Sequence, residues 1–96
     1  MDVCRVVGQA VATAKDEGLH GMKLMLVRAT DTAGAAVGDA FAAADTVGAG
    51  EGELVLVARG SAARATARTS DIPADAAIVA ILDSLSVEGT VTYRKT

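Results

Sequence analysis

Short valine-rich runs separated by glycine-containing turns dominate the pattern of hydrophobic and polar positions along the chain. Runs of this length predict β-strands, and clusters of Gly, Asp and Ser between them predict turns. The predicted strands are Met1–Ala14, Met22–Thr30, Asp39–Val47, Glu53–Arg59 and Val91–Arg94, with turns or loops at Lys15–Gly21, Asp31–Gly38 and Gly48–Gly52. Gly8 in the middle of the first strand predicts a bulge or sharp bend.

Two further segments carry helical signals. Gly60–Ala67 predicts one or two helical turns, with Ser61 as the N-cap residue. Ala76–Leu85 has two interpretations, because its large apolar residues have the spacing of a helix face while the run Ala76–Leu82 equally fits a buried strand.

Several short strands with glycine-rich turns predict an all-β barrel or sandwich. Two of the strands, Met22–Thr30 among them, are apolar on both faces, so one face should fill the barrel and the other should be covered. Ala40, Ala42 and Ala44 form a stripe of small side chains that lets another backbone approach closely. That backbone is a neighbour within the chain or a second subunit, and the pattern does not choose between them.

Composition makes the predicted core lean. The chain has 96 residues and a mass of 9.6 kDa, which corresponds to a single domain, 1–96. Alanine accounts for 21 residues, and Phe41 and Tyr93 are the only aromatic ones. Alanine buries little apolar area, and small domains with lean cores often gain stability by association. The composition therefore points to an oligomer.

Charge and apolar run length argue against several classes of protein. No apolar run approaches the length of a membrane-spanning helix, and the first residues lack the features of a signal peptide. The net charge of −3 and the pI of about 4.9 argue against a nucleic-acid binder. The single cysteine, Cys4, cannot form an internal disulfide. We expect a cytoplasmic protein with no membrane or nucleic-acid partner.

No arrangement of residues predicts a catalytic, cofactor or metal site. His20 is interpreted as a surface residue and Cys4 as a buried structural thiol. Ser61 lacks the G-x-S-x-G context of a nucleophile elbow. The segment GAGEG, Gly48–Gly52, precedes a strand rather than the helix of a phosphate-binding loop, so a tight turn is expected. Arg64 and Arg68, four residues apart, offer a possible anion contact, with salt bridging or solvation the simpler interpretation.

Four blocks carry a resemblance to a known family. CRVVGQAVATAK, LHGMKLMLVR, ADTVGAGEGELVLVARGSAAR and PADAAIVAILDSL resemble, in the same order, the vertex proteins of bacterial microcompartment shells, the EutN/CcmL family. Ala62 replaces a serine that is frequent there, and Ala74 stands where valine is frequent. The resemblance implies a five-stranded OB-like β-barrel, all-β with one short helix, in which Ala76–Leu85 is a strand and residues 86–96 form a C-terminal tail or edge strand.

The same resemblance implies a structural role without catalysis. Family members form homopentamers that cap the corners of cytoplasmic polyhedral shells, alongside hexameric and trimeric shell proteins. Candidates for subunit contacts or the central opening are Ala40, Ala42, Ala44, Gly48, Gly50, Glu51, Gly60, Ser61 and Arg64. Two alternatives remain open at this point: an OB-type ligand-binding or nucleic-acid-binding module, and an enzyme subunit whose site forms between chains from Glu51, Asp45 and Arg64.

Overall fold

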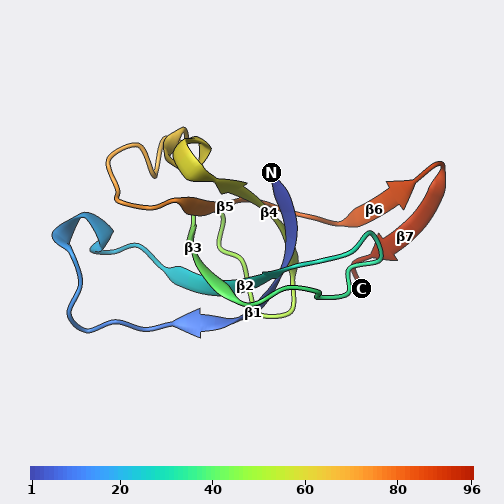
Figure 1. Ribbon diagram of the computed structural model, residues 1–96, viewed down its shortest axis with the longest axis horizontal. Coiled ribbons are helices and arrows are strands. Elements are labelled where there is room, and N and C mark those ends of the chain that lie inside the picture. Colours follow the sequence, from blue (N-terminus) through green and yellow to red (C-terminus); the bar gives the residue numbers. More distant parts are fainter.

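Five of the seven strands close into a barrel in the computed structural model, which describes residues 1–96 (Figure 1). The barrel strands are β1 (Asp2–Ala10), β2 (Leu24–Ala29), β3 (Phe41–Asp45), β4 (Leu54–Arg59) and β5 (Ala76–Ile81). Their order is β1-β2-β3-β5-β4, with β4 pairing back to β1. All neighbours are antiparallel except β3 and β5, which run parallel. The predicted five-stranded OB-like barrel is confirmed.

Side chains that alternate along the strands point into the barrel and fill its interior. The buried cluster contains Cys4, Val6, Met25, Val27, Ala43, Ala49, Val55, Val57, Ala76 and Ile78. The register between β1 and β2 shifts between Val6 and Gly8, so the bulge predicted at the glycine is present. Leu24 and Leu26, which alternate with the interior residues of β2, are only half-buried on the outside. Nothing within the chain fully covers this outer apolar face.

The predicted strand limits need two corrections. The first strand ends at Ala10 rather than Ala14, because its pairing with β2 stops at Ala10 opposite Leu24 and the residues beyond are exposed. The ambiguous segment from Ala76 is a strand, but it ends at Ile81. Its pairing with both β3 and β4 resolves what periodicity alone left open.

The chain contains two 3-10 turns, of which only the second lies in Gly60–Ala67, where one short helix was expected. They are η1 (Glu17–Leu19) and η2 (Gly60–Arg64). The prediction that Ser61 is an N-cap was wrong: the turn begins at Gly60, Arg59 occupies the cap position two residues before Ser61, and no side chain caps the turn. Ser61 is therefore already inside the turn, where its hydroxyl cannot serve as the N-cap acceptor.

A β-hairpin follows the barrel and projects from it (Figure 1). It consists of β6 (Ser84–Val87) and β7 (Thr90–Arg94), which pair only with each other. Glu88 and Gly89 join them with φ angles of 50° and 82°, as a type I′ turn requires. The hairpin extends the molecule to 44 × 23 × 21 Å, with η1 and η2 toward the opposite end of the long axis.

Candidate functional site

Arg5 fixes the base of the hairpin to the barrel. Its Nε and Nη2 atoms donate to the carbonyl oxygen of Gly34 at 3.0 and 2.7 Å, and its Nη1 donates to that of Gly52 at 2.8 Å. The guanidinium also lies 5.7 Å from the centre of the Tyr93 ring on β7. One side chain from β1 thus holds two loops and the hairpin together.

A second anchor joins the residue after β7 to the turn before β4. Lys95 Nζ lies 2.6 Å from Glu53 Oε2. The hydrogen bond from Lys95, assisted by one from the Gly50 backbone, lowers the pKa of Glu53, and the same bond to Glu53 raises the pKa of Lys95. Thr92 Oγ1 in addition donates to the carbonyl oxygen of Thr32. The base of the hairpin is therefore held at three points, while its tip is free.

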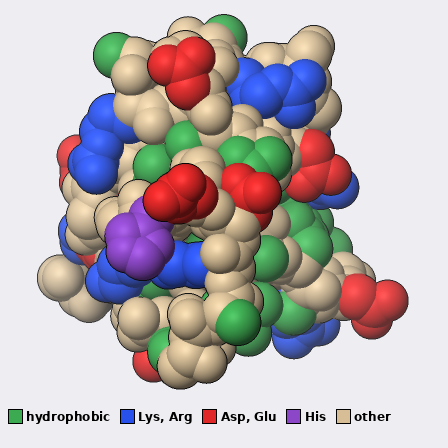
Figure 2. Space-filling model, turned by 90° about the vertical axis from the view of Figure 1, so that its left-hand side faces the viewer, with side chains coloured by type: hydrophobic (Ala, Val, Ile, Leu, Met, Phe, Trp, Pro, Cys, Tyr) green, Lys and Arg blue, Asp and Glu red, His purple; other side chains and the backbone are tan.

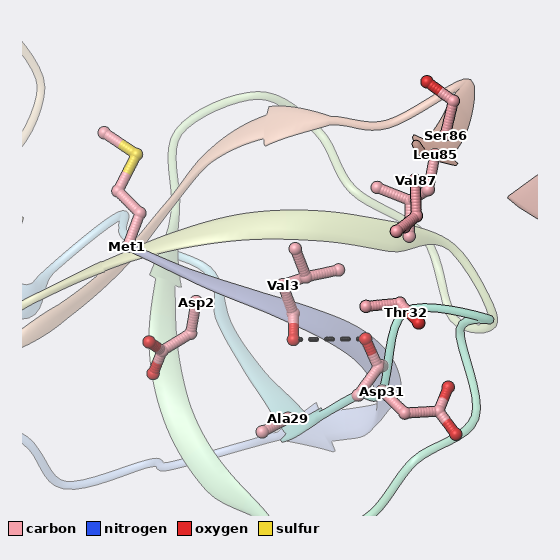
Figure 3. A pocket seen from close by; sticks show the side chains of 10 residues that line it. Met1, Asp2, Val3, Ala29, Asp31, Thr32, Leu85, Ser86 and Val87 are labelled. Carbon is pink, nitrogen blue, oxygen red and sulfur yellow. Dashed lines mark hydrogen bonds between the residues drawn. The ribbon is translucent and has the colours of Figure 1, made fainter. Parts of the chain in front are cut away.

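An apolar groove, here the hairpin groove, lies between β6 and the barrel and has a volume of about 470 Å³. Its apolar lining is Met1, Val3, Ala29, Leu85 and Val87. Figure 3 shows Val3 and Ala29 on the barrel side and Leu85 and Val87 facing them from the hairpin. Val87 keeps 40% of its surface exposed and Met1 keeps 83%.

Polar groups beside the hairpin groove already have partners within the chain. Asp31 Oδ1 accepts hydrogen bonds from the backbone N–H groups of Ala33 and Ala35, and Asp2 forms an ion pair with Arg59. Both carboxylates of the lining are thus engaged, and half of its ten residues are hydrophobic. The groove is consequently better matched to a hydrophobic protein segment than to a small polar ligand.

A second apolar groove, here the β3 groove, lies at the other end of the molecule and has a volume of about 160 Å³. Its hydrophobic lining is Leu19, Leu24, Ala42, Ala44, Ala74 and Ala76, with Pro73 and Asp75 completing the wall. Figure 2 views this end of the molecule and shows hydrophobic side chains gathered among acidic and basic ones. Within the predicted alanine stripe, Ala44 is buried, whereas Ala40 and Ala42 are exposed.

The side chain of Asp45 stabilises the start of the glycine turn through hydrogen bonds to its backbone. This buried carboxylate accepts hydrogen bonds from the N–H groups of Val47, Gly48 and Ala49 at 3.0, 3.1 and 2.9 Å. The tight turn predicted for Gly48–Gly52 is therefore present, and the strand β4 follows it. Because its oxygens cap the turn, Asp45 is committed to structure rather than to a site with Glu51, which is exposed.

The predicted contact residues outside the alanine stripe lie at both ends of β4. The glycine turn before this strand contains Gly48, Gly50 and Glu51, and η2 after it contains Gly60, Ser61 and Arg64. The two groups therefore do not form one site within a single chain. Arg64 donates to the carbonyl oxygen of Ala74 at 3.1 Å and therefore lies beside the β3 groove, whereas Arg68 donates to that of Thr46 at 3.3 Å.

Cys4 and His20 have the environments expected from sequence. Cys4 is fully buried, and burial, with a smaller effect of the nearby Asp2 carboxylate, raises the pKa of its thiol to about 11. His20 is exposed. Both aromatic rings of the chain have an arginine over their face. The Arg59 guanidinium lies 4.1 Å from the centre of the Phe41 ring, and the Arg5 guanidinium lies 5.7 Å from that of Tyr93.

The hairpin groove is the feature that the sequence interpretation missed. The signal was present at Glu88-Gly89, a two-residue connection between two short runs of β-forming residues. Asn-Gly and Asp-Gly are the usual pairs at such turns, because Asn and Asp tolerate the left-handed conformation. Glutamate adopts it here at φ 50°, so the Glu88-Gly89 pair is a weaker hairpin signal than Asn-Gly or Asp-Gly.

The family model described as "Ethanolamine utilisation protein EutN/carboxysome" matches residues 1–83, the whole barrel. The chain belongs to the EutN/CcmL family. One curated relative in this family is the carboxysome shell vertex protein CcmL from Nostoc sp. PCC 7120. It is 44% identical to this chain over 96 residues, which cover 99% of this chain and 95% of the relative. The solved CcmL structure from that organism has a TM-score of 0.93 and 44% identity, over 99% of this chain and 100% of that one.

Other EutN/CcmL members match over nearly the same length. The bacterial microcompartment shell vertex protein EutN of Salmonella typhimurium is 37% identical over 95 residues, covering 99% of this chain and 96% of the relative. GrpN, a pentameric microcompartment shell protein from Rhodospirillum rubrum, has a TM-score of 0.81 and 38% identity, covering 91% of this chain and 100% of that one. No helix of the present chain has the length and apolar character needed to cross a membrane.

Proposed function

We infer that this chain is a structural vertex protein of a bacterial microcompartment shell, located in the cytoplasm, and that it acts as a pentamer. The observation that carries this inference is the full-length similarity to shell vertex proteins, which includes the hairpin as well as the barrel. The relatives are named for a place in a shell and not for a reaction. The function is therefore structural rather than enzymatic.

The mechanism is geometric. A flat layer of six-fold units cannot close into a polyhedron, and five-fold units at the corners supply the missing curvature. We propose that the pentamer contacts hexameric and trimeric shell proteins through loops at its outer edge. The glycine turn (Gly48, Gly50, Glu51) and η2 (Gly60, Ser61, Arg64) are the candidate loops, and they lie at opposite ends of β4.

Native mass spectrometry tests the oligomeric state. A homopentamer of a 9.6 kDa chain has a mass of about 48 kDa. A dominant monomer or dimer at micromolar concentration would contradict the proposal. A hexamer would keep the shell role and remove the vertex mechanism.

Shell assembly in cells tests the function itself. Cells that make the corresponding shell without this chain, and without a second vertex protein, should contain elongated or leaky shells. The enclosed enzymes should keep their activity in lysate, because the vertex contributes no chemistry. Normally closed shells in such cells would refute the assignment, and loss of a soluble enzymatic activity would favour the inter-chain enzyme instead.

A further inference from the structure

A polar pocket, here the Tyr93 pocket, lies at the base of the hairpin, where the last residues of the chain meet the turn before β4 (Figure 1). Its volume of about 430 Å³ is in the range of pockets that hold small organic molecules. Tyr93 is its one hydrophobic residue. Its charged side chains are those of Arg5, Arg94, Lys95, Glu51 and Glu53. The pocket shares no residue with the hairpin groove or the β3 groove, and the proposed vertex function gives it no role.

Two cations of the Tyr93 pocket have no counter-ion within the chain. Lys95 and Glu53 form an ion pair and neutralise each other. The hydrogen bonds of Arg5 all go to carbonyl oxygens, which carry no formal charge, and Arg94 is exposed and forms no ion pair. Neither guanidinium group lies within ion-pair distance of a carboxylate, that of Glu51 on the same wall included.

Arg5 also keeps hydrogen-bond donors free. A guanidinium group carries five N–H groups, two of them on each terminal nitrogen. Arg5 uses one N–H on each of its three nitrogens for the carbonyls of Gly34 and Gly52, so one remains on Nη1 and one on Nη2. Two such donors are what a guanidinium offers to the two oxygens of a carboxylate or phosphate. Because the carbonyls already hold this side chain in place, a ligand would cost it little conformational freedom.

The aromatic ring gives the pocket an apolar wall beside these cations. The centre of the Tyr93 ring lies 5.7 Å from the Arg5 guanidinium carbon. An inorganic ion would occupy a small part of the 430 Å³ and would leave the ring unused. A molecule with an anionic group and a short carbon skeleton uses both the cations and the ring.

We propose that the Tyr93 pocket binds a small organic anion that carries a carboxylate or phosphate group. Arg5 and Arg94 hold the anionic group, and the carbon skeleton packs against the Tyr93 ring. The inference does not rest on the proposed vertex function, because the residues that form the pocket belong to a single chain. Carboxylates and phosphate esters offer the same kind of oxygen to a guanidinium, and the experiment separates the two.

The intrinsic fluorescence of the protein reports on this pocket, because Tyr93 is the only tyrosine and the chain has no tryptophan. Titrations of the wild-type protein with glycerol 3-phosphate and with succinate should change the emission along a saturating curve for at least one of them. The compound that saturates identifies the anionic group. Glycerol, the neutral analogue, should give no saturating change. A linear change with both anions, equal to that of free N-acetyltyrosinamide, would overturn the proposal.

Three variants test which side chains hold the anion. Arg94→Ala should weaken binding about tenfold, because a charged hydrogen-bond donor is lost. Glu53→Gln should strengthen binding, because the Lys95 ammonium loses its carboxylate partner and becomes available to the ligand. Arg68→Ala is the matched control, since Arg68 is an exposed arginine outside the pocket, and its affinity should equal that of wild type.

Equal affinities for Arg94→Ala and Arg68→Ala would also overturn the proposed site. Native mass spectrometry of the same wild-type sample separates this result from the proposed vertex function. A pentamer without saturable anion binding would remove the site and leave the vertex function standing. Saturable binding that depends on Arg94 in a protein that is not pentameric would support the site and contradict the proposed pentamer.

Discussion

At the scale of single residues, Arg5 concentrates more interactions than any other side chain near the hairpin. Its three hydrogen bonds and its position beside Tyr93 join β1, two loops and β7. Hydrogen bonds from a charged group contribute more than neutral ones, and a guanidinium fork makes several at once. The other two contacts at the hairpin base are weaker, since Lys95 forms a single exposed ion pair and Thr92 donates a single hydrogen bond.

Replacing Arg5 should destabilise the chain and loosen the hairpin. Arg5→Ala should lower the free energy of unfolding by about 2–3 kcal/mol, because the Gly34 and Gly52 carbonyls lose charge-assisted partners. Arg5→Lys should recover only part of the loss, since an ammonium cannot reproduce the fork. Urea unfolding at fixed protein concentration measures this. The exposed Arg94→Ala is the control, and an equal loss there would contradict the role of Arg5.

The Glu53–Lys95 pair should give a defined pH dependence. The pKa of Glu53 is lowered from 4.5, so its stabilising effect is complete above that value and is lost as the pH falls through the lowered pKa. The pKa of Lys95 is raised from 10.5, so its effect is complete below that value and is lost as the pH rises through the raised pKa.

The urea midpoints of wild type and Glu53→Gln should therefore differ by a constant amount between these limits. The difference should shrink in acid below 4.5 and in base above 10.5. Glu51→Gln serves as the control, since Glu51 is exposed and forms no ion pair. A difference that persists unchanged into acid would show that the pair does not contribute.

At the scale of elements, the loop between β2 and β3 and the hairpin fit together through a glycine. Gly34 has φ 88°, and a Cβ there would lie 3.0 Å from Arg5 Nη2 and 3.1 Å from Tyr93 Cδ1. Gly8, at the bulge of β1, has no such restriction: its nearest neighbour would be Leu26 Cδ1 at 3.7 Å. Two glycines in one barrel thus have different physical requirements.

Alanine substitutions should separate these two glycines. Gly34→Ala should destabilise the chain by about 1–3 kcal/mol through left-handed strain and the contact with Arg5. Gly8→Ala should cost nothing, or stabilise by about 0.4–1 kcal/mol through the unfolded state. Thermal and urea unfolding measure both. Equal losses at the two positions would contradict this account of Gly34.

At the scale of the whole molecule, an elongated chain with a lean core is expected to depend on its neighbours. The outer leucines of β2 and the valines of the hairpin stay partly exposed within one chain. Covering them in a ring removes apolar area from water, at roughly 25 cal/mol per Å². Folding stability and assembly are then linked.

This linkage predicts a thermal midpoint that rises with protein concentration, because mass action favours the pentamer. Differential scanning calorimetry across a wide concentration range measures it. A wild-type midpoint that does not change with concentration would contradict the coupling.

Local patterns were sufficient to predict the first four barrel strands, the bulge at Gly8 and the tight turn at Gly48–Gly52, whereas the fifth strand, β5, was predicted only from the family resemblance. Each depends on neighbouring residues: β-branched runs extend the backbone, and glycine permits bends that other residues resist. The buried environment of Cys4 followed from its place in a valine-rich strand. The family also followed from residue order, because the four blocks span Cys4–Leu85 and the family model matches residues 1–83.

The remaining features depend on contacts between distant segments. The parallel pairing of β3 with β5 joins Ala44 to Ala77, 33 positions apart, and periodicity carries no information about such partners. Arg5 meets Gly34, Gly52 and Tyr93 only after the barrel closes. The exposure of Ala42 beside a buried Ala44 likewise depends on where the barrel wall leaves a groove, because side-chain burial is a property of packing and not of residue type.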